Sequence, residues 1–170
     1  MILKDKNILL AVTGSIAIYK SLELIRLFIK AGANVKVILS DGAKKFINPI
    51  TFEAISQNKV LDESSESWDK SQNYNHIDIT KWADILLIAP ATANTINKIS
   101  CGIADNLLLQ TVLACKKKII IAPAANTNMI ENPITTESIN NLKNLGFEVL
   151  QTQTKELACK DVGNGAMLEP

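Results

Sequence analysis

Short apolar runs recur along this chain, and each is too continuous for a strand that has one face in water. The four clearest runs span residues 7–13, 34–39, 84–89 and 118–122, and Val, Ile and Leu dominate them. Such runs are typical of strands buried on both faces, as in a parallel sheet covered by helices on both sides. The length of 170 residues suits one domain with one core.

Helical patterns separate these predicted strands. Residues 15–31 place an apolar stripe from Ile18 to Ile29 on one helical face, and Gly32 supplies a C-terminal cap. Further helices are predicted at residues 49–56, 92–100, 106–115 and 133–145, and a last strand at 147–150. The alternation predicts an α/β fold, a single-domain, doubly wound (Rossmann-like) parallel sheet with the three layers of a flavodoxin. Residues 62–75 and 151–170 lack this periodicity, and we expect them to be loops beside the sheet.

Composition excludes several classes of partner. The net charge is +1 and aromatic residues make up 5%, so the chain has neither a basic field nor a stacking platform for nucleic acid. No apolar run approaches the roughly 20 residues of a membrane span, and the N-terminal residues lack a signal-peptide pattern. Three cysteines without a CxxC pair and one histidine do not suggest a metal site. We therefore expect a cytoplasmic protein without metal, membrane or nucleic-acid partners.

Polar segments follow four of the predicted strands. These segments, residues 13–17, 40–43, 89–95 and 123–129, are rich in small, hydroxyl and amide residues. Open α/β sheets bind ligands outside the carboxyl ends of their strands, so the segments should line one site. The first is a glycine turn into a helix start, which favours an anion, although it lacks the GxGxxG and Walker patterns. Thr92, Asn94 and Thr95 exceed what helix capping needs. The set fits one phosphate and its polyol chain better than a dinucleotide, which favours FMN.

Three other residues each allow two interpretations. His76 is either an exposed loop residue or, beside an apolar flavin site, a general base. Asn126 either forms a turn or binds a group such as a carboxylate. Cys159 lies in a glycine-containing loop, where its thiol is either structural or accessible and reactive.

Five segments, in this order along the chain, resemble motifs of the flavin-containing cysteine decarboxylases: residues 13–20, 76–78, 89–108, 123–129 and 157–167. The resemblance covers essentially the whole chain. It implies an FMN site formed by Gly14, Ser15, Ile16, Ser40, Thr92, Ala93, Asn94 and Thr95. It also divides the chain into an FMN-binding α/β core, residues 1–150, and a substrate-covering flap with the C-terminal end, residues 151–170.

The reaction that this resemblance implies is decarboxylation of 4'-phosphopantothenoylcysteine to 4'-phosphopantetheine in coenzyme A biosynthesis. FMN oxidises the cysteine thiol to a thioaldehyde, loss of CO2 leaves an enethiol, and the reduced flavin returns the electrons. His76 would be the base, Asn126 would hold the carboxylate and Cys159 would donate a proton, while Asn126, Met129 and Ala158 would bind substrate. The family forms homotrimers and homododecamers in which subunits share the FMN site. The resemblance also implies a domain that is fused to, or acts with, a phosphopantothenate–cysteine ligase.

The chain departs from the family's motifs at Ala125, where a Met is usual, and at Ala166, where an Arg is usual. The first change reshapes the pocket wall, and the second removes a contact with substrate phosphate. Alternative functions are a flavin prenyltransferase of related fold, a non-enzymatic regulatory binding module and an electron-transferring flavodoxin. The prenyltransferase and the flavodoxin need no Cys159 flap, and regulatory modules typically lose His76 or the pair of Asn126 and Cys159, so the decarboxylase is favoured.

Overall fold

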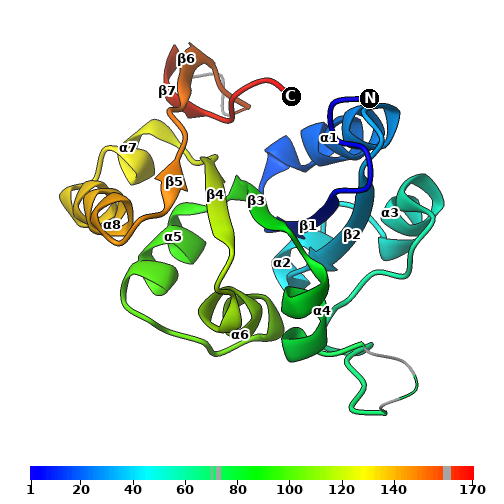
Figure 1. Ribbon diagram of the computed structural model, residues 1–170. Coiled ribbons are helices and arrows are strands. Elements are labelled where there is room, and N and C mark those ends of the chain that lie inside the picture. Colours follow the sequence, from blue (N-terminus) through cyan, green and yellow to red (C-terminus); the bar gives the residue numbers. More distant parts are fainter. Residues whose placement is uncertain (70, 72–73, 159–161) are drawn as a thin grey trace.

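The computed structural model describes residues 1–69, 71, 74–158 and 162–170. Its centre is a five-stranded sheet with the strand order β2-β1-β3-β4-β5, in which every pair is parallel (Figure 1). The strands are β1 (Asn7–Val12), β2 (Asn34–Leu39), β3 (Ile85–Ala91), β4 (Lys118–Pro123) and β5 (Glu148–Val149). The chain passes from β1 outward to β2 and then returns to β3 on the other side of β1. This reversal creates the crevice at which doubly wound sheets bind ligands.

Side chains of each strand point alternately into two separate apolar cores. On β1, Leu9 and Ala11 belong to one core, and Leu10 and Val12 to the other. All four are at most 1% exposed. Burial on both faces explains the continuous apolar runs, and the three-layer, doubly wound fold predicted from them is confirmed.

Helices cover both faces of the sheet. The core that holds Leu10 also contains residues of α1 (Tyr19–Lys30) and α3 (Pro49–Ser56). The core that holds Leu9 contains residues of α4 (His76–Trp82), α5 (Ala93–Ser100), α6 (Leu107–Ala114) and α8 (Pro133–Asn144). In Figure 1, α1 and α3 lie on one side of the strands, and α5, α6 and α8 lie on the other. No helix within the described ranges is long and apolar enough to cross a membrane.

The first helix does not begin where the sequence predicts. A short 3-10 turn, η1 (Ile16–Ile18), precedes α1. The extended Ser15 caps this turn by accepting the Ala17 N–H.

Helix α4 is absent from the predicted helices, and it follows a segment expected to be a loop. Its N-cap Asn75 accepts two backbone N–H groups, which was a readable start signal. The one-turn helices α2 (Asp41–Lys44) and α7 (Thr127–Ile130) are too short to show a period.

A small antiparallel hairpin stands where a loop is expected in residues 151–170. It pairs β6 (Gln153–Glu156) with β7 (Val162–Ala166) and lies above the carboxyl end of the main sheet, in orange and red in Figure 1. The hairpin attaches to the turn after β4, where the Ala125 N–H donates to the Gly165 carbonyl oxygen at 3.0 Å. The Thr127 hydroxyl donates to the Asn164 carbonyl oxygen at 2.7 Å. Because these contacts join residues far apart in the sequence, the hairpin's own residues lack the alternation of apolar and polar positions that would predict strands.

Candidate functional site

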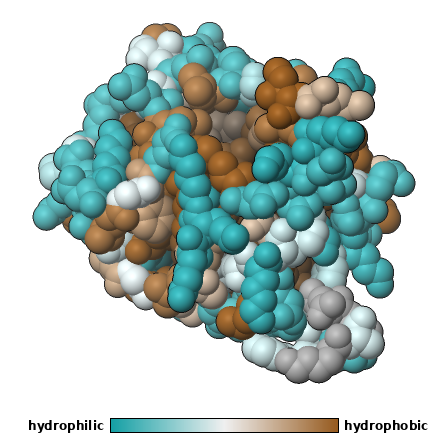
Figure 2. Space-filling model, viewed as in Figure 1, coloured by the Kyte–Doolittle hydropathy of each residue, from teal (hydrophilic) through white to brown (hydrophobic). Residues whose placement is uncertain are grey.

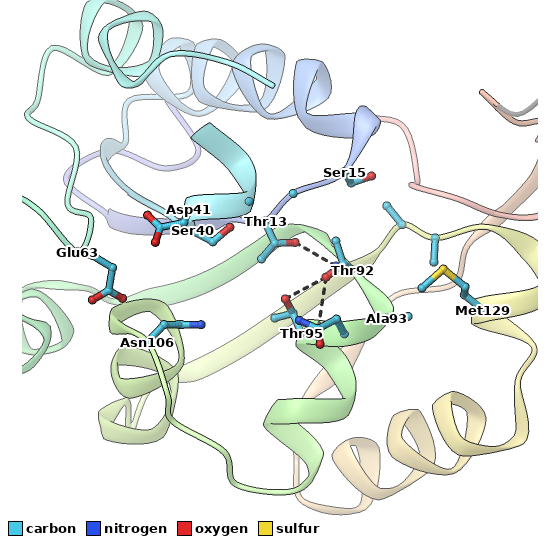
Figure 3. A pocket seen from close by; sticks show the side chains of 15 residues that line it. Thr13, Ser15, Ser40, Asp41, Glu63, Thr92, Ala93, Thr95, Asn106 and Met129 are labelled. Atoms are coloured by element: carbon cyan, nitrogen blue, oxygen red, sulfur yellow. Dashed lines mark hydrogen bonds between the residues drawn. The ribbon is translucent and has the colours of Figure 1, made fainter. Parts of the chain in front are cut away.

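A cavity of about 500 Å³ lies at the carboxyl ends of β1, β2 and β3 (Figure 3). Seven of the eight residues predicted to hold a cofactor line it: Gly14, Ser15, Ser40, Thr92, Ala93, Asn94 and Thr95. The eighth, Ile16, lies in a neighbouring cavity described below. The volume of the first cavity is within the range of small-molecule sites, about 300–1,000 Å³. Segments at different strand ends, from Gly14 to Thr95, therefore form one binding surface.

Close contact between two glycines shapes one wall of this first cavity. A Cβ atom on Gly14 would lie 2.8 Å from the carbonyl carbon of Gly42, closer than real Cβ atoms approach backbone. The turns after β1 and β2 can therefore meet only if residue 14 has no side chain. Their contact leaves backbone exposed to a ligand.

Hydroxyl groups on the cavity wall hold the loops and also face the ligand space. Ser15 and Ser40 each accept a backbone N–H, from Ala17 and Ala43, at 3.2 Å. An accepting hydroxyl keeps its own hydrogen, so both serines can still donate to a phosphate or to a polyol oxygen. The serine side chains thus hold both loops, and their hydroxyl hydrogens remain available to a ligand.

Thr13, which sequence reasoning did not place among the cofactor-binding residues, joins the first and third loops. Its hydroxyl donates to the Pro90 carbonyl oxygen at 2.6 Å and accepts the Thr92 N–H at 3.0 Å. Thr92 in turn accepts the Thr95 N–H at 3.2 Å and caps α5, as the dashed lines in Figure 3 show. The positive end of this helix, together with nearby hydroxyls, favours an anionic group.

The two ends of the first cavity differ in chemistry. In Figure 3, Glu63 and Asn106 lie at one end and Met129 lies at the other, near Ala93. Asp41 also lines the cavity and binds Lys44 at 2.8 Å. Hydrogen bonding to Asp41 is the main cause that raises the pKa of Lys44 above its usual value. Carboxylates suit the hydroxyl groups of a polyol, whereas the alanines and Met129 suit a flat apolar ring.

Glu63 reaches the start of α6 through a contact that no local pattern indicates. The Glu63 carboxylate accepts the Leu107 N–H at the first turn of α6, and Asn106 caps the same helix. Asn106 was readable as a helix start. Glu63 was not, because it comes from the polar segment before α4 and reaches this helix only in the folded chain.

A second cavity of about 570 Å³ adjoins the first and shares Ser15, Ala124 and Ala125 with it. Its opposite wall is the β6–β7 hairpin, including Ala158 and Ala166, and Asn126 also lines it. Figure 2 shows a hollow with apolar (brown) walls on this part of the surface. The structure thus places Asn126 and Ala158 together, and Met129 beside them on the first cavity.

A buried lysine fixes the chain after the hairpin. Lys20 is 2% exposed, and its ammonium donates to the Met167 carbonyl oxygen at 2.6 Å and to Glu169 at 2.9 Å. Lys155 on β6 binds the same carboxylate. Hydrogen bonds from Lys155 and Lys20 hold the pKa of Glu169 below its usual value. This ion-pair cluster ties the hairpin to the start of α1.

His76 lies apart from both cavities. It borders a third, open cavity of about 280 Å³ with Ala104, Gln110, Leu113 and Ala114. Its Nδ1 is 2.7 Å from Glu66 Oε1. Within one chain, the described residues therefore do not unite His76 with Asn126. Cys159 lies outside the described residues.

A doubly wound sheet whose strand ends combine hydroxyls, a helix start and an apolar wall defines a protein that binds a phosphorylated, nucleotide-like cofactor. The family model named Flavoprotein matches residues 2–170, and the chain belongs to this family.

Individual relatives agree with this assignment. The coenzyme A biosynthesis bifunctional protein CoaBC of Bacillus subtilis is 40% identical over 99% of this chain, which spans only 41% of that relative. A probable phosphopantothenoylcysteine decarboxylase of Streptococcus mutans is 43% identical, over 96% of this chain and 92% of the relative. Among solved structures, a mutant PPC decarboxylase complexed with pantothenoylaminoethenethiol is 32% identical with a TM-score of 0.85, covering 98% of this chain and 92% of that chain. The FMN-binding protein AtHal3 is 33% identical with a TM-score of 0.83, covering 98% and 91%.

Proposed function

We propose that this chain is an FMN-dependent decarboxylase that converts 4'-phosphopantothenoylcysteine to 4'-phosphopantetheine in coenzyme A biosynthesis. The observation that carries the proposal is the pair of adjoining cavities. One is lined by seven predicted cofactor residues, and the other holds Asn126 and Ala158 beneath the hairpin, with Ser15, Ala124 and Ala125 between them. A redox cofactor and a substrate bound there would be in contact.

The donors around the first cavity fit FMN. Ser15, Ser40 and the start of α5 offer hydroxyl and N–H donors for a phosphate, whereas Asp41 and Glu63 accept hydrogen bonds from a polyol. Ala93, Ala124, Ala125 and Met129 would contact the ring system. When bound, FMN supplies reversible two-electron oxidation of the substrate thiol.

The side chain of Asn126 suits a carboxylate. Its Oδ1 accepts the Asn128 N–H at 2.9 Å, which fixes the amide so that its NH2 group is the donor side. The substrate carboxylate would bind there until CO2 leaves. In our proposal Cys159 protonates the enethiol and Met129 and Ala158 contact the substrate. Ala125 and Ala166 leave room where bulkier residues are usual in the family.

The separate position of His76 fits a shared active site. We propose that the chain forms a homotrimer, which can assemble further into a dodecamer. In this trimer, His76 of one subunit would complete the active site formed by the two cavities of a neighbouring subunit. A matching ligase, fused to the domain or separate, would supply the substrate, as the bifunctional relatives suggest. A cytoplasmic location is part of the same proposal.

The decisive experiment incubates the purified protein with 4'-phosphopantothenoylcysteine and follows flavin absorbance and product mass together. We expect transient bleaching of the flavin, release of CO2 and formation of 4'-phosphopantetheine. A flavin that binds but is never reduced, with substrate unchanged, would refute the decarboxylase and favour a binding module.

Two variants test the assigned residues. His76→Asn should retain FMN and lose turnover. Cys159→Ala should still oxidise the substrate but accumulate the enethiol. Formation of 4'-phosphopantetheine at the normal rate by Cys159→Ala would show that another group donates the proton.

A further inference from the structure

A carboxylate and an aromatic ring hold the chain's one histidine on two sides. Glu66 Oε1 lies 2.7 Å from His76 Nδ1, and the same oxygen accepts the His76 backbone N–H at 3.3 Å. The Trp68 ring meets the imidazole edge to face, with centroids 5.5 Å apart and planes at 83°. The side chains of His76 and Glu66 are only 19% and 20% exposed. The imidazole therefore has one orientation, set by groups ten or fewer positions upstream.

The segment that carries Glu66 is itself anchored. The Glu66 N–H donates to the Asp62 carbonyl oxygen at 3.2 Å, and the Ser67 N–H donates to the Tyr74 carbonyl oxygen at 2.8 Å. The Asp62 carboxylate binds Lys44 of α2 at 3.0 Å. Contacts on both sides of Glu66 thus fix the backbone that carries its carboxylate, and they keep this carboxylate beside the histidine.

Hydrogen bonding at one ring nitrogen decides the state of the other. A neutral imidazole carries one N–H, and an ionised carboxylate only accepts hydrogen bonds, so the short contact places the hydrogen on Nδ1. Nε2 then keeps its lone pair and can accept a proton. The reverse tautomer would present an N–H at Nε2 and could not act as a base there.

We propose that Glu66 is a positioning residue, which holds His76 in the Nδ1–H tautomer so that Nε2 takes up the proton released by the substrate. The Glu66 carboxylate then stabilises the resulting imidazolium across the same hydrogen bond. This inference rests on the proposed function, because it is the proposed decarboxylation that requires His76 to accept a proton. Acidic partners orient histidines in the same way in metal sites and hydrolases.

Nitrogen NMR of the holoenzyme with isotope-labelled histidine tests this directly. The sequence contains a single histidine, so one pair of ring-nitrogen signals reports its tautomer without assignment. In the alkaline range where the signals no longer change with pH, we expect a protonated Nδ1 and a lone-pair Nε2. Glu66→Ala should mix the two tautomers. Glu66→Gln should keep part of the preference, because its amide oxygen still accepts.

Kinetics of the same variants provide the second readout. Glu66→Ala should lower kcat about 10–100-fold, the usual effect of removing such a partner, while KM and FMN content stay unchanged. Glu66→Gln should lie between this variant and the wild type. Asp69→Asn is the matched control, because this exposed carboxylate in the same segment bonds only to Ser71 among the described contacts. It should alter neither the nitrogen signals nor kcat.

The results separate this inference from the proposed function. An Nε2–H tautomer in the wild type, or unchanged nitrogen signals in Glu66→Ala, would overturn the role of Glu66. If Glu66→Ala does not fold, unchanged signals and kcat in Glu66→Gln would overturn it equally. If the tautomer responds as expected but the wild type does not decarboxylate 4'-phosphopantothenoylcysteine, the proposed function fails and the positioning of His76 by Glu66 stands.

Discussion

Replacing Thr13 by Val should loosen the joint between the first and third loops of the cofactor cavity. Val has nearly the shape of Thr but lacks the hydroxyl, which here donates to Pro90 and accepts from Thr92. Thr13 itself is 2% exposed, so the change removes a buried hydroxyl. The Pro90 carbonyl oxygen keeps a second bond, from the Thr13 N–H at 3.2 Å, whereas the Thr92 N–H loses its acceptor.

The expected cost follows from these contacts. Each hydrogen bond contributes about 1 kcal/mol, and a buried donor without a partner costs about 1–3 kcal/mol. Since Thr92 is only partly buried, water can satisfy some of that need, and we expect a loss of about 2 kcal/mol. For a chain of this size, that loss lowers Tm by about 4–8 °C. Affinity for FMN should also fall, because the two loops form one wall.

Urea unfolding and thermal melting of the apoprotein measure this loss, and fluorescence titration measures FMN binding. Thr13→Ser is the control, because it keeps the hydroxyl and removes only a methyl group. Loss of this methyl group should lower the free energy of unfolding by about 0.8 kcal/mol. Equal urea midpoints for Thr13→Val and the wild type would refute the reasoning that this hydroxyl joins the loops.

Three other changes test the packing and the hairpin. Phe52→Ala removes a fully buried ring from the core under α3 and should cost about 3–5 kcal/mol in urea unfolding; a loss below 1 kcal/mol would mean that the site refills. Gly165→Ala should detach the hairpin, since φ is +129° and the added Cβ would overlap the Ala125 carbonyl oxygen; hydrogen exchange of β6 and β7 should rise, and unchanged protection would argue against the close contact. Glu169→Gln should remove an acid-sensitive attachment. Hydrogen bonds, above all from Lys155, depress the pKa of Glu169, so its stabilising effect is present above the usual value of 4.5 and is lost as the pH falls through the lower folded value. Protection of the wild-type hairpin should fall in that range, and protection of Glu169→Gln should not.

Local patterns were sufficient to predict the main elements. The strands at 7–13 and 84–89 were readable because both of their faces are buried, which leaves a continuous apolar run. Thr92 and the residues after it marked a helix start at a strand end, and the structure places that start on the cofactor cavity. Capping and burial act over a few residues, so they are recorded in neighbouring positions of the sequence.

Contacts between distant segments were not readable in this way. The β6–β7 hairpin is stabilised by the turn after β4 and by Lys20, so its own residues show no strand pattern. Glu63 reaches the cavity only because α6 begins beside it. The same holds for the contact between Glu66 and His76, beside which Ser67 pairs antiparallel with Tyr74.

By itself, the sequence determined the α/β class, the places where strands end and the residue types that offer donors to a phosphorylated cofactor. The tertiary structure alone decided that β1 lies between β2 and β3, so that Gly14 meets Gly42 and Thr13 meets Thr92. It also placed Asn126 beside the cofactor cavity and His76 away from it. The physical reason is that burial and capping depend on near neighbours, whereas the meeting of loops depends on the order in which the strands pair.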